Sequence, residues 1–126
     1  MIKVNIYKQS NYPVKSSDIK KKLSKFFEGH GIVSEADVNI SLVGEKKMLD
    51  LGKKYLNDSK IHNVLSFEPS NEFIYPPDGK IHLGEIIVCF PVAVRQAKDE
   101  NVLINKKVYE LIEHGAAHLL GEHHDE

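Results

Sequence analysis

Four of the seven histidines in this sequence lie close together near its C-terminus, in the segment HGAAHLLGEHH at residues 114–124. His114 and His118 are four residues apart, so on a helix they share one face and can bind the same metal ion. Gly121 can adopt a left-handed backbone conformation, which would turn the chain back and bring His124 to the ion as a third ligand. Three imidazole ligands with a further position open to water are the usual arrangement of a catalytic zinc site.

The choice of the third ligand depends on spacing. His123 and Asp125 are alternatives, but a position six residues after His118, beyond a glycine turn, favours His124. The two alanines between the first two histidines are small and leave room for a neighbouring element to approach the helix. We therefore predict one zinc ion at this site, although neutral imidazoles also accept nickel and copper.

The same segment indicates which zinc chemistry to exclude. It matches the pattern H-x-x-x-H-x-x-G-x-x-H of the metzincin proteases, in which a glutamate directly after the first histidine is the general base. Here that position is Gly115, which cannot accept a proton, and Glu113 lies on the wrong side of His114. The sequence therefore argues against peptide hydrolysis by the usual zinc-protease route, and it identifies no catalytic base.

Hydrophobic periodicity predicts the elements that would position these histidines. Strands are predicted at residues 2–8, 37–43, 63–69 and 82–90. Helices are predicted at about residues 16–29, 44–57, 91–101 and 105–121, and Pro-Pro-Asp-Gly predicts a turn within 71–80. The order β-α-β-α-β-β-α-α predicts an α+β fold: a mixed sheet of about four strands packed with helices, in a single domain spanning 1–126, with the three-histidine zinc site on the last helix.

Local expectations follow from residue type. Residues 16–18 (Ser-Ser-Asp) offer side-chain oxygens for the N-cap of the first helix. Leu56 is expected to belong to the apolar stripe of the second helix. Cys89 is expected to be a buried core residue of its strand, and His82 is expected to face solvent at the start of that strand.

Composition and charge narrow the class of protein. The 126 residues are 41% hydrophobic and 28% charged, which is typical of a soluble globular domain. The single cysteine cannot form an internal disulfide, and no apolar run approaches the roughly 20 residues of a membrane span, so we expect a cytoplasmic protein. Residues 1–60 carry 12 lysines and 7 acids, whereas residues 61–126 carry 5 basic residues and 11 acids. The basic half could suit a polyanion, unless its lysines are simply solvated helix faces.

Three motifs support a family resemblance. The pattern H-G-x-L-H-L-x-G-Y-D-H is matched at His114, Gly115, His118, Leu119, Gly121 and His124, and the departures at 117, 122 and 123 remove none of the three predicted ligands. The segment NVLSF at 63–67, preceded by Leu56-Asn57, resembles L-N…[DN]-V-L-S-F, and LGEIIVC at 83–89 resembles L-G-D-I-V-I-C. In these motifs the chain resembles the YbeY family of bacterial metal-dependent endoribonucleases.

The resemblance implies a zinc-dependent endoribonuclease specific for single-stranded RNA, acting in maturation of the 3′ end of small-subunit ribosomal RNA and in ribosome quality control. It implies ribosomal RNA and the small ribosomal subunit as partners, with neither DNA nor a membrane. Asn63 and Ser66 are candidates for RNA contacts. Glu85 is a candidate base or a carboxylate that orients a ligand, unless it only forms a salt bridge at its strand end. The lysines at 20–25, 46, 47, 53 and 54 are candidate phosphate contacts.

One departure motivates a second hypothesis. The family usually carries an arginine before the V-L-S-F strand, whereas residues 58–62 (DSKIH) form a shorter stretch without one. Lys60 could offer a positive charge but not the planar two-pronged contact of arginine, and His62 could contact RNA or lie near the metal. The alternative is a non-catalytic, ribosome-associated RNA-binding maturation factor whose zinc is structural.

Overall fold

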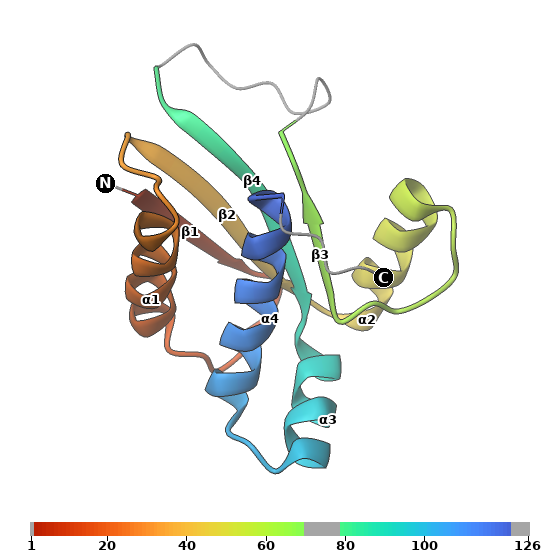
Figure 1. Cartoon of the computed structure of the whole chain (residues 1–126). Coiled ribbons are helices and arrows are strands. Elements are labelled where there is room, and N and C mark those ends of the chain that lie inside the picture. The colour runs from red at the N-terminus through yellow and green to blue at the C-terminus, as the bar shows by residue number, and fades with distance from the viewer. Residues whose placement is uncertain (1, 70–78, 122–126) are drawn as a thin grey trace.

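The computed structural model describes residues 2–69 and 79–121 (Figure 1). Its elements are β1 (Ile2–Lys8), α1 (Ser16–Gly29), β2 (Ala36–Val43), α2 (Glu45–Leu51), a π-helical turn η1 (Gly52–Leu56), β3 (Val64–Phe67), β4 (Ile81–Cys89), α3 (Phe90–Glu100) and α4 (Ile104–Leu119). The predicted order of strands and helices is thereby confirmed. The turn expected at Pro-Pro-Asp-Gly lies mostly outside the described residues.

The four strands form one mixed sheet in the order β1-β2-β4-β3. The strands β1, β2 and β4 run parallel, and β3 pairs antiparallel with β4. Parallel neighbours need crossover connections, which the helices between the strands supply. In the described part of the chain β1 and β3 are the two edge strands, and β3 carries the VLSF part of the NVLSF motif. The predicted α+β class and mixed sheet are confirmed.

A β-bulge interrupts the pairing of β2 with β4. The register shifts between Asp37 and Asn39, so Leu83 and Gly84 together oppose Val38 alone. Gly84 has a φ of 134°, which side chains rarely allow. The bulge therefore changes which residues of β4 point to each face of the sheet.

Gly84 is also a point of close approach. A Cβ at this position would collide with the carbonyl oxygen of Phe67 on β3, and it would lie 2.9 Å from Cδ2 of Leu119 at the end of α4. Glycine thus lets both the edge strand and the end of α4 pack tightly against β4. This close packing explains why a glycine stands at position 84, in the L-G-E motif.

The helices α1 and α4 cover one face of the sheet (Figure 1). In α1 the buried residues Ile19, Leu23 and Phe27 recur every four positions, which is the stripe of an amphipathic helix. They share one core cluster with Ile40 of β2 and Ile86 of β4, both fully buried. Burial of these large apolar side chains holds the helices on the sheet.

The opposite face is more polar and only partly covered. There α2 packs beside β3 and β4, and Val43, Met48 and Cys89 form a second, small core cluster. Cys89 is fully buried as predicted, and desolvation raises the pKa of its thiol. Farther along this face, the Asn39 side-chain amide donates to the Glu85 carboxylate at 2.7 Å.

Two local predictions about helices were wrong. The N-cap of α1 is Lys15, one residue before the predicted Ser-Ser-Asp, and it makes no side-chain cap because lysine has no acceptor atom. The Lys15 backbone N–H donates separately to Oδ1 of Asn105 at 2.9 Å. Leu56 is 46% exposed. The second helix changes to π-helical geometry at Gly52, which rotates the later residues away from the α-helical stripe.

His82 does not face solvent as predicted. Its side chain is 15% exposed, and its Nδ1 lies 2.8 Å from Oδ1 of Asp37 on the neighbouring strand. The bulge sets this pairing, so sequence alternation alone could not indicate it. In the described part of the chain, no helix is long and apolar enough to cross a membrane.

Candidate metal centre

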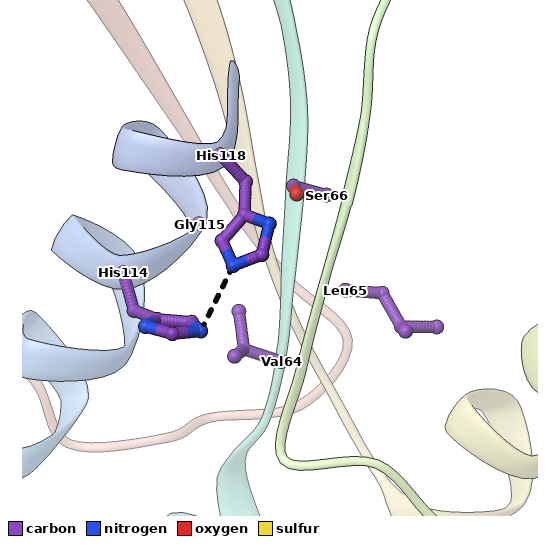
Figure 2. A pocket seen from close by; sticks show the side chains of 6 residues that line it. All are labelled: Val64, Leu65, Ser66, His114, Gly115 and His118. Atoms are coloured by element: carbon purple, nitrogen blue, oxygen red, sulfur yellow. Dashed lines mark hydrogen bonds between the residues drawn. The ribbon is translucent and has the colours of Figure 1, made fainter. Parts of the chain in front are cut away.

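His114 and His118 lie one turn apart on α4, beside β3, and their rings point toward each other (Figure 2). The two Nε2 atoms are 3.1 Å apart, and the ring centroids are 4.6 Å apart with an interplanar angle of 56°. His114 is exposed and His118 is half-buried. The predicted helix spacing has therefore brought two imidazole nitrogens to a common, accessible point.

The residues fit a shared zinc ion. Nitrogens bound at about 2.0–2.1 Å to a tetrahedral zinc ion lie about 3.3 Å from one another. The observed separation of 3.1 Å is close to that value. Without an ion, the N–H of one ring can donate to the nitrogen of the other. His114 and His118 would thus be two of the ligands of a zinc site.

The predicted third ligand, His124, lies beyond the described residues. Gly121 has a φ of 84°, and its N–H donates to the carbonyl oxygen of His118 at 3.0 Å. The predicted left-handed turn is confirmed. His123 and Asp125, the alternatives to His124, also fall outside the described residues, and the assignment of all three ligands stays a prediction. Within 2–69 and 79–121, no three His, Cys, Asp or Glu side chains are grouped closely enough to hold a metal ion.

Gly115 has a packing role at this site. A Cβ there would lie 2.8 Å from Cγ2 of Ile86 and 3.5 Å from Cγ2 of Val64. The missing side chain lets α4 approach β3 and β4 closely, and this approach places His114 and His118 beside the edge strand. The sequence by itself indicates only that Gly115 cannot act as a base.

A cavity of about 220 Å³ separates the histidines from β3 (Figure 2). Its lining residues are Val64, Leu65, Ser66, His114, Gly115 and His118. Val64 and Ser66 extend from β3 toward α4, whereas Leu65 extends away from it (Figure 2). Ser66, a predicted candidate, therefore presents a hydroxyl that can both donate and accept hydrogen bonds opposite the two imidazoles.

Asn63 lies at the approach to His114 and not beside both histidines. A neighbouring hollow of about 250 Å³ is lined by Asn63, Val64, Lys107, Glu110, Leu111 and His114. The Asn63 side-chain amide donates to Oε1 of Gln96 at 3.3 Å. Lys107, which pairs with Glu100 at 2.8 Å, was not singled out from the sequence. Its position seven residues before His114, on the same helix face, is the signal that could have indicated it.

The structure does not bring Glu85 to the histidines. Its neighbour Ile86 faces α4, and adjacent strand residues point to opposite faces of a sheet, so Glu85 points away. It lines a different cavity together with Phe67 and Ile87. A direct role as a base, or as a carboxylate that orients the histidines, is therefore not supported.

The stretch that lacks the family's arginine is held by a histidine–carboxylate pair. Nε2 of His62 lies 2.9 Å from Oδ2 of Asp58, and the Lys60 backbone N–H donates to Oδ1 of Asp58 at 3.2 Å. The hydrogen bond from Lys60 is the main reason that the pKa of Asp58 is lowered; His62 contributes in the same direction, while desolvation opposes it. His62 thus holds this segment together, and it does not line the histidine cavity.

Glu113 is also engaged elsewhere. The Tyr109 hydroxyl donates to its carboxylate, and burial followed by this hydrogen bond raises the pKa of Tyr109. Glu113 remains a poor candidate for a base at His114. Glu85 and Glu113 are the two carboxylates considered as a base, and neither lines the histidine cavity.

The fold and the site define an α+β domain with an accessible histidine pair on its last helix, suited to a metal ion beside the edge of a mixed sheet. A solved structure from Thermotoga maritima shares the fold, with a TM-score of 0.58 and 24% identity over 97% of this chain and 75% of that one.

Sequence relatives specify the family. The profile of the family Endoribonuclease YbeY matches residues 5–126. The chain is 39% identical to the endoribonuclease YbeY of Prochlorococcus marinus over 74% of its own length and 52% of the relative's. It is 33% identical to that of Dehalococcoides mccartyi over 86% and 69% of the two lengths, and 27% identical to that of Francisella tularensis subsp. novicida over 99% and 78%. The chain belongs to the YbeY endoribonuclease family, and it spans about half the length of the Prochlorococcus relative.

Proposed function

We propose that this protein is a zinc-dependent endoribonuclease that cuts single-stranded RNA. One observation carries the proposal: in a chain of this family, two histidine Nε2 atoms lie 3.1 Å apart at a cavity beside the edge strand. His124 would complete the ligand set. The site of action would be the cytoplasm, in maturation of the 3′ end of small-subunit ribosomal RNA and in ribosome quality control, with the small ribosomal subunit as partner.

The metal ion, the Ser66 hydroxyl and solvent would have separate roles in the reaction. When bound, a zinc ion supplies Lewis-acid polarisation of a phosphoryl oxygen and lowers the pKa of a water molecule to about 7. The Ser66 hydroxyl can donate to a phosphate oxygen from the opposite wall of the cavity. The attacking oxygen would come from water or from the neighbouring 2′-hydroxyl of the RNA, and it would bond to phosphorus as the bond from phosphorus to the leaving ribose oxygen breaks. Because neither Glu85 nor Glu113 lines the cavity, the attacking group would lose its proton to solvent, and the leaving oxygen would take a proton from solvent.

The packing of α4 argues against the alternative of a purely structural zinc. The helix buries Val108, Leu111, Ile112 and Ala116 against the sheet, while His114 is exposed. A structural zinc contributes the folding energy that the core lacks, and here the helix is held by its own apolar face. We therefore expect the fold to persist without the ion.

The decisive experiment measures cleavage of a labelled single-stranded RNA by the full chain. Zinc-loaded protein, chelator-treated protein and the His118→Ala variant are compared. The proposal expects cleavage only in the first sample, because the pair loses one of its two nitrogens in the variant. His30→Ala is the matched control. The His30 ring is hydrogen-bonded through Nδ1 to the carbonyl oxygen of Phe26 on α1, away from the cavity.

Thermal unfolding of the same samples separates the two functions. A folded His118→Ala variant that binds RNA and does not cut it supports the nuclease. If the variant unfolds, or if the folded and zinc-loaded wild type binds RNA without cutting it, the maturation-factor hypothesis is favoured.

A further inference from the structure

A second cavity lies on the reverse side of the edge strand. It has a volume of about 190 Å³ and is lined by Ser41, Val43, Lys47, Leu51, Tyr55, Phe67, Glu85 and Ile87. Phe67 and Ile87 are neighbours of Ser66 and Ile86, which face the histidine side, so the two cavities lie on opposite faces of the sheet. We infer that this cavity binds one base of the RNA substrate, specifically a base that carries an exocyclic amino group. This inference rests on the proposed function.

The aromatic side chains suit a planar ring. The rings of Tyr55 and Phe67 lie 4.9 Å apart between centroids at an angle of 52°, and both residues are half-buried. The aliphatic side chains of Leu51 and Ile87 line the same space. Single-stranded RNA is commonly held by stacking of unpaired bases on such aromatic side chains.

The volume limits what can enter. Pockets for drug-sized ligands measure about 300–1,000 Å³, whereas this cavity measures about 190 Å³. A cavity of this size matches a single base better than it matches a whole nucleotide or a peptide of several residues. The sugar and the phosphate would then remain outside, at the rim.

Glu85 provides the selectivity. A carboxylate only accepts hydrogen bonds, so it favours a base that presents a donor over one that presents an acceptor. The Asn39 amide donates to one oxygen at 2.7 Å, and Asn5 donates to Asn39 at 3.0 Å, so the carboxylate is held in place from the sheet side. An exocyclic amine can donate to it, as cytosine N4 does to glutamate. The carbonyl oxygen of uracil at the same position would meet an acceptor and be rejected.

The charge at the rim fits a polyanion. Lys47 lines the cavity, and Nζ of Lys54 lies 5.0 Å from the centre of the Tyr55 ring. Lysines so placed can contact the phosphates that flank a bound base. The sequence indicated two groups of lysines as candidate phosphate contacts. The group on α2 and η1, to which Lys47 and Lys54 belong, lies beside this second cavity, which we call the reverse cavity.

The two cavities meet at β3. Ser66 lines one and Phe67 lines the other, so the two cavities lie on the two faces of the same edge strand. An RNA strand that crosses this edge can place a base in the reverse cavity while a neighbouring phosphate reaches the histidine pair. The reverse cavity would thus select where the strand is cut.

The test uses metal-free, isotope-labelled full chain in an NMR titration with cytidine 5′-monophosphate (CMP) or uridine 5′-monophosphate (UMP). These probes differ at the group that Glu85 would read. CMP should shift the amide signals of Phe67, Glu85 and Ile87, and it should bind about tenfold more tightly than UMP, as one good base contact predicts. Glu85→Gln should remove this preference without unfolding the protein, because glutamine keeps an oxygen to accept from Asn39. Glu68→Gln, an exposed position beside β3, is the matched control and should keep the preference.

Equal binding of CMP and UMP, shifts confined to the residues around His114 and His118, or an unchanged preference in Glu85→Gln would overturn the inference. The RNA cleavage assay scores the proposed function separately. Cleavage without CMP binding at the reverse cavity would reject only the base site. Selective CMP binding by a chain that cuts no RNA would support the base site and reject the nuclease.

Discussion

The two faces of the sheet carry their polar groups in different ways. On the face under α1 and α4 the strands are apolar, and the chemistry comes from a helix, through His114 and His118. On the reverse face the strands themselves carry the polar groups, in a row from Asn5 through Asn39 to Glu85. The difference shows two ways to place a functional group: by local helix spacing, or by strand register set through the whole sheet.

The largest expected effect comes from the bulge that sets this register. Gly84→Ala should lower the free energy of unfolding by roughly 2–3 kcal/mol, because the new Cβ meets the Phe67 carbonyl and the positive φ disfavours a side chain. Urea unfolding followed by circular dichroism measures it. Gly31→Ala is the control: its φ is 91° but nothing lies within 4 Å, so only backbone strain of about 1 kcal/mol remains. Equal losses in the two variants would show that the close contact is unimportant.

The next effect concerns the approach of α4. Gly115→Ala should cost about 1 kcal/mol net, because overpacking against Ile86 at about 1–3 kcal/mol exceeds a gain in helix propensity of about 1 kcal/mol. Zinc affinity should change little, since both histidines move with the helix, whereas RNA cleavage should fall as the cavity widens. Calorimetric zinc titration and the cleavage assay measure these together.

Gly29→Ala is the matched control for that substitution. It is also a helical glycine, but nothing lies within 4 Å of its added Cβ. We expect a small gain in stability and full cleavage activity. Loss of zinc binding in Gly115→Ala would mean that the helix is distorted and not merely displaced.

A smaller effect is expected on the reverse face. Asn39→Ala removes the donor to Glu85 and the acceptor for Asn5, which should cost about 1 kcal/mol, and zinc binding on the other face should not change. Asn11→Ala, at an exposed position, should stay within about 0.5 kcal/mol of wild type. Altered zinc affinity in Asn39→Ala would show that the two faces are coupled.

The last prediction concerns the reactivity of the Cys89 thiol. Because burial raises the pKa of its thiol, less of the reactive thiolate forms, and a thiol reagent at pH 8 should label the folded chain at least about a hundredfold more slowly than the unfolded chain. The raised pKa of the Cys89 thiol favours folding below the ordinary thiol pKa of about 8.5, and this contribution to stability is lost as the pH rises through the raised pKa. Rapid labelling of the native protein would contradict the burial.

Local patterns account for much of what was predictable. The order of the elements follows from hydrophobic periodicity, and the histidine pair follows from helix spacing, because both depend on residues close together in the sequence. The N-cap of α1 was mispredicted because the helix already begins at Ser16, which leaves Lys15, a residue without a side-chain acceptor, at the N-cap. Leu56 was mispredicted because η1 departs from α-helical geometry at Gly52.

The sequence by itself determined the β-α-β-α-β-β-α-α order, the pairing of His114 with His118 and the turn at Gly121, since each arises from short-range backbone geometry. Only the tertiary structure decided that Gly115 admits α4 to the sheet, that His62 is tied to Asp58, and that Glu85 faces away from the histidines. The physical reason is the same in each case. Close approach between elements and the face to which a strand residue points are set by register and packing across the sheet, which no local pattern records.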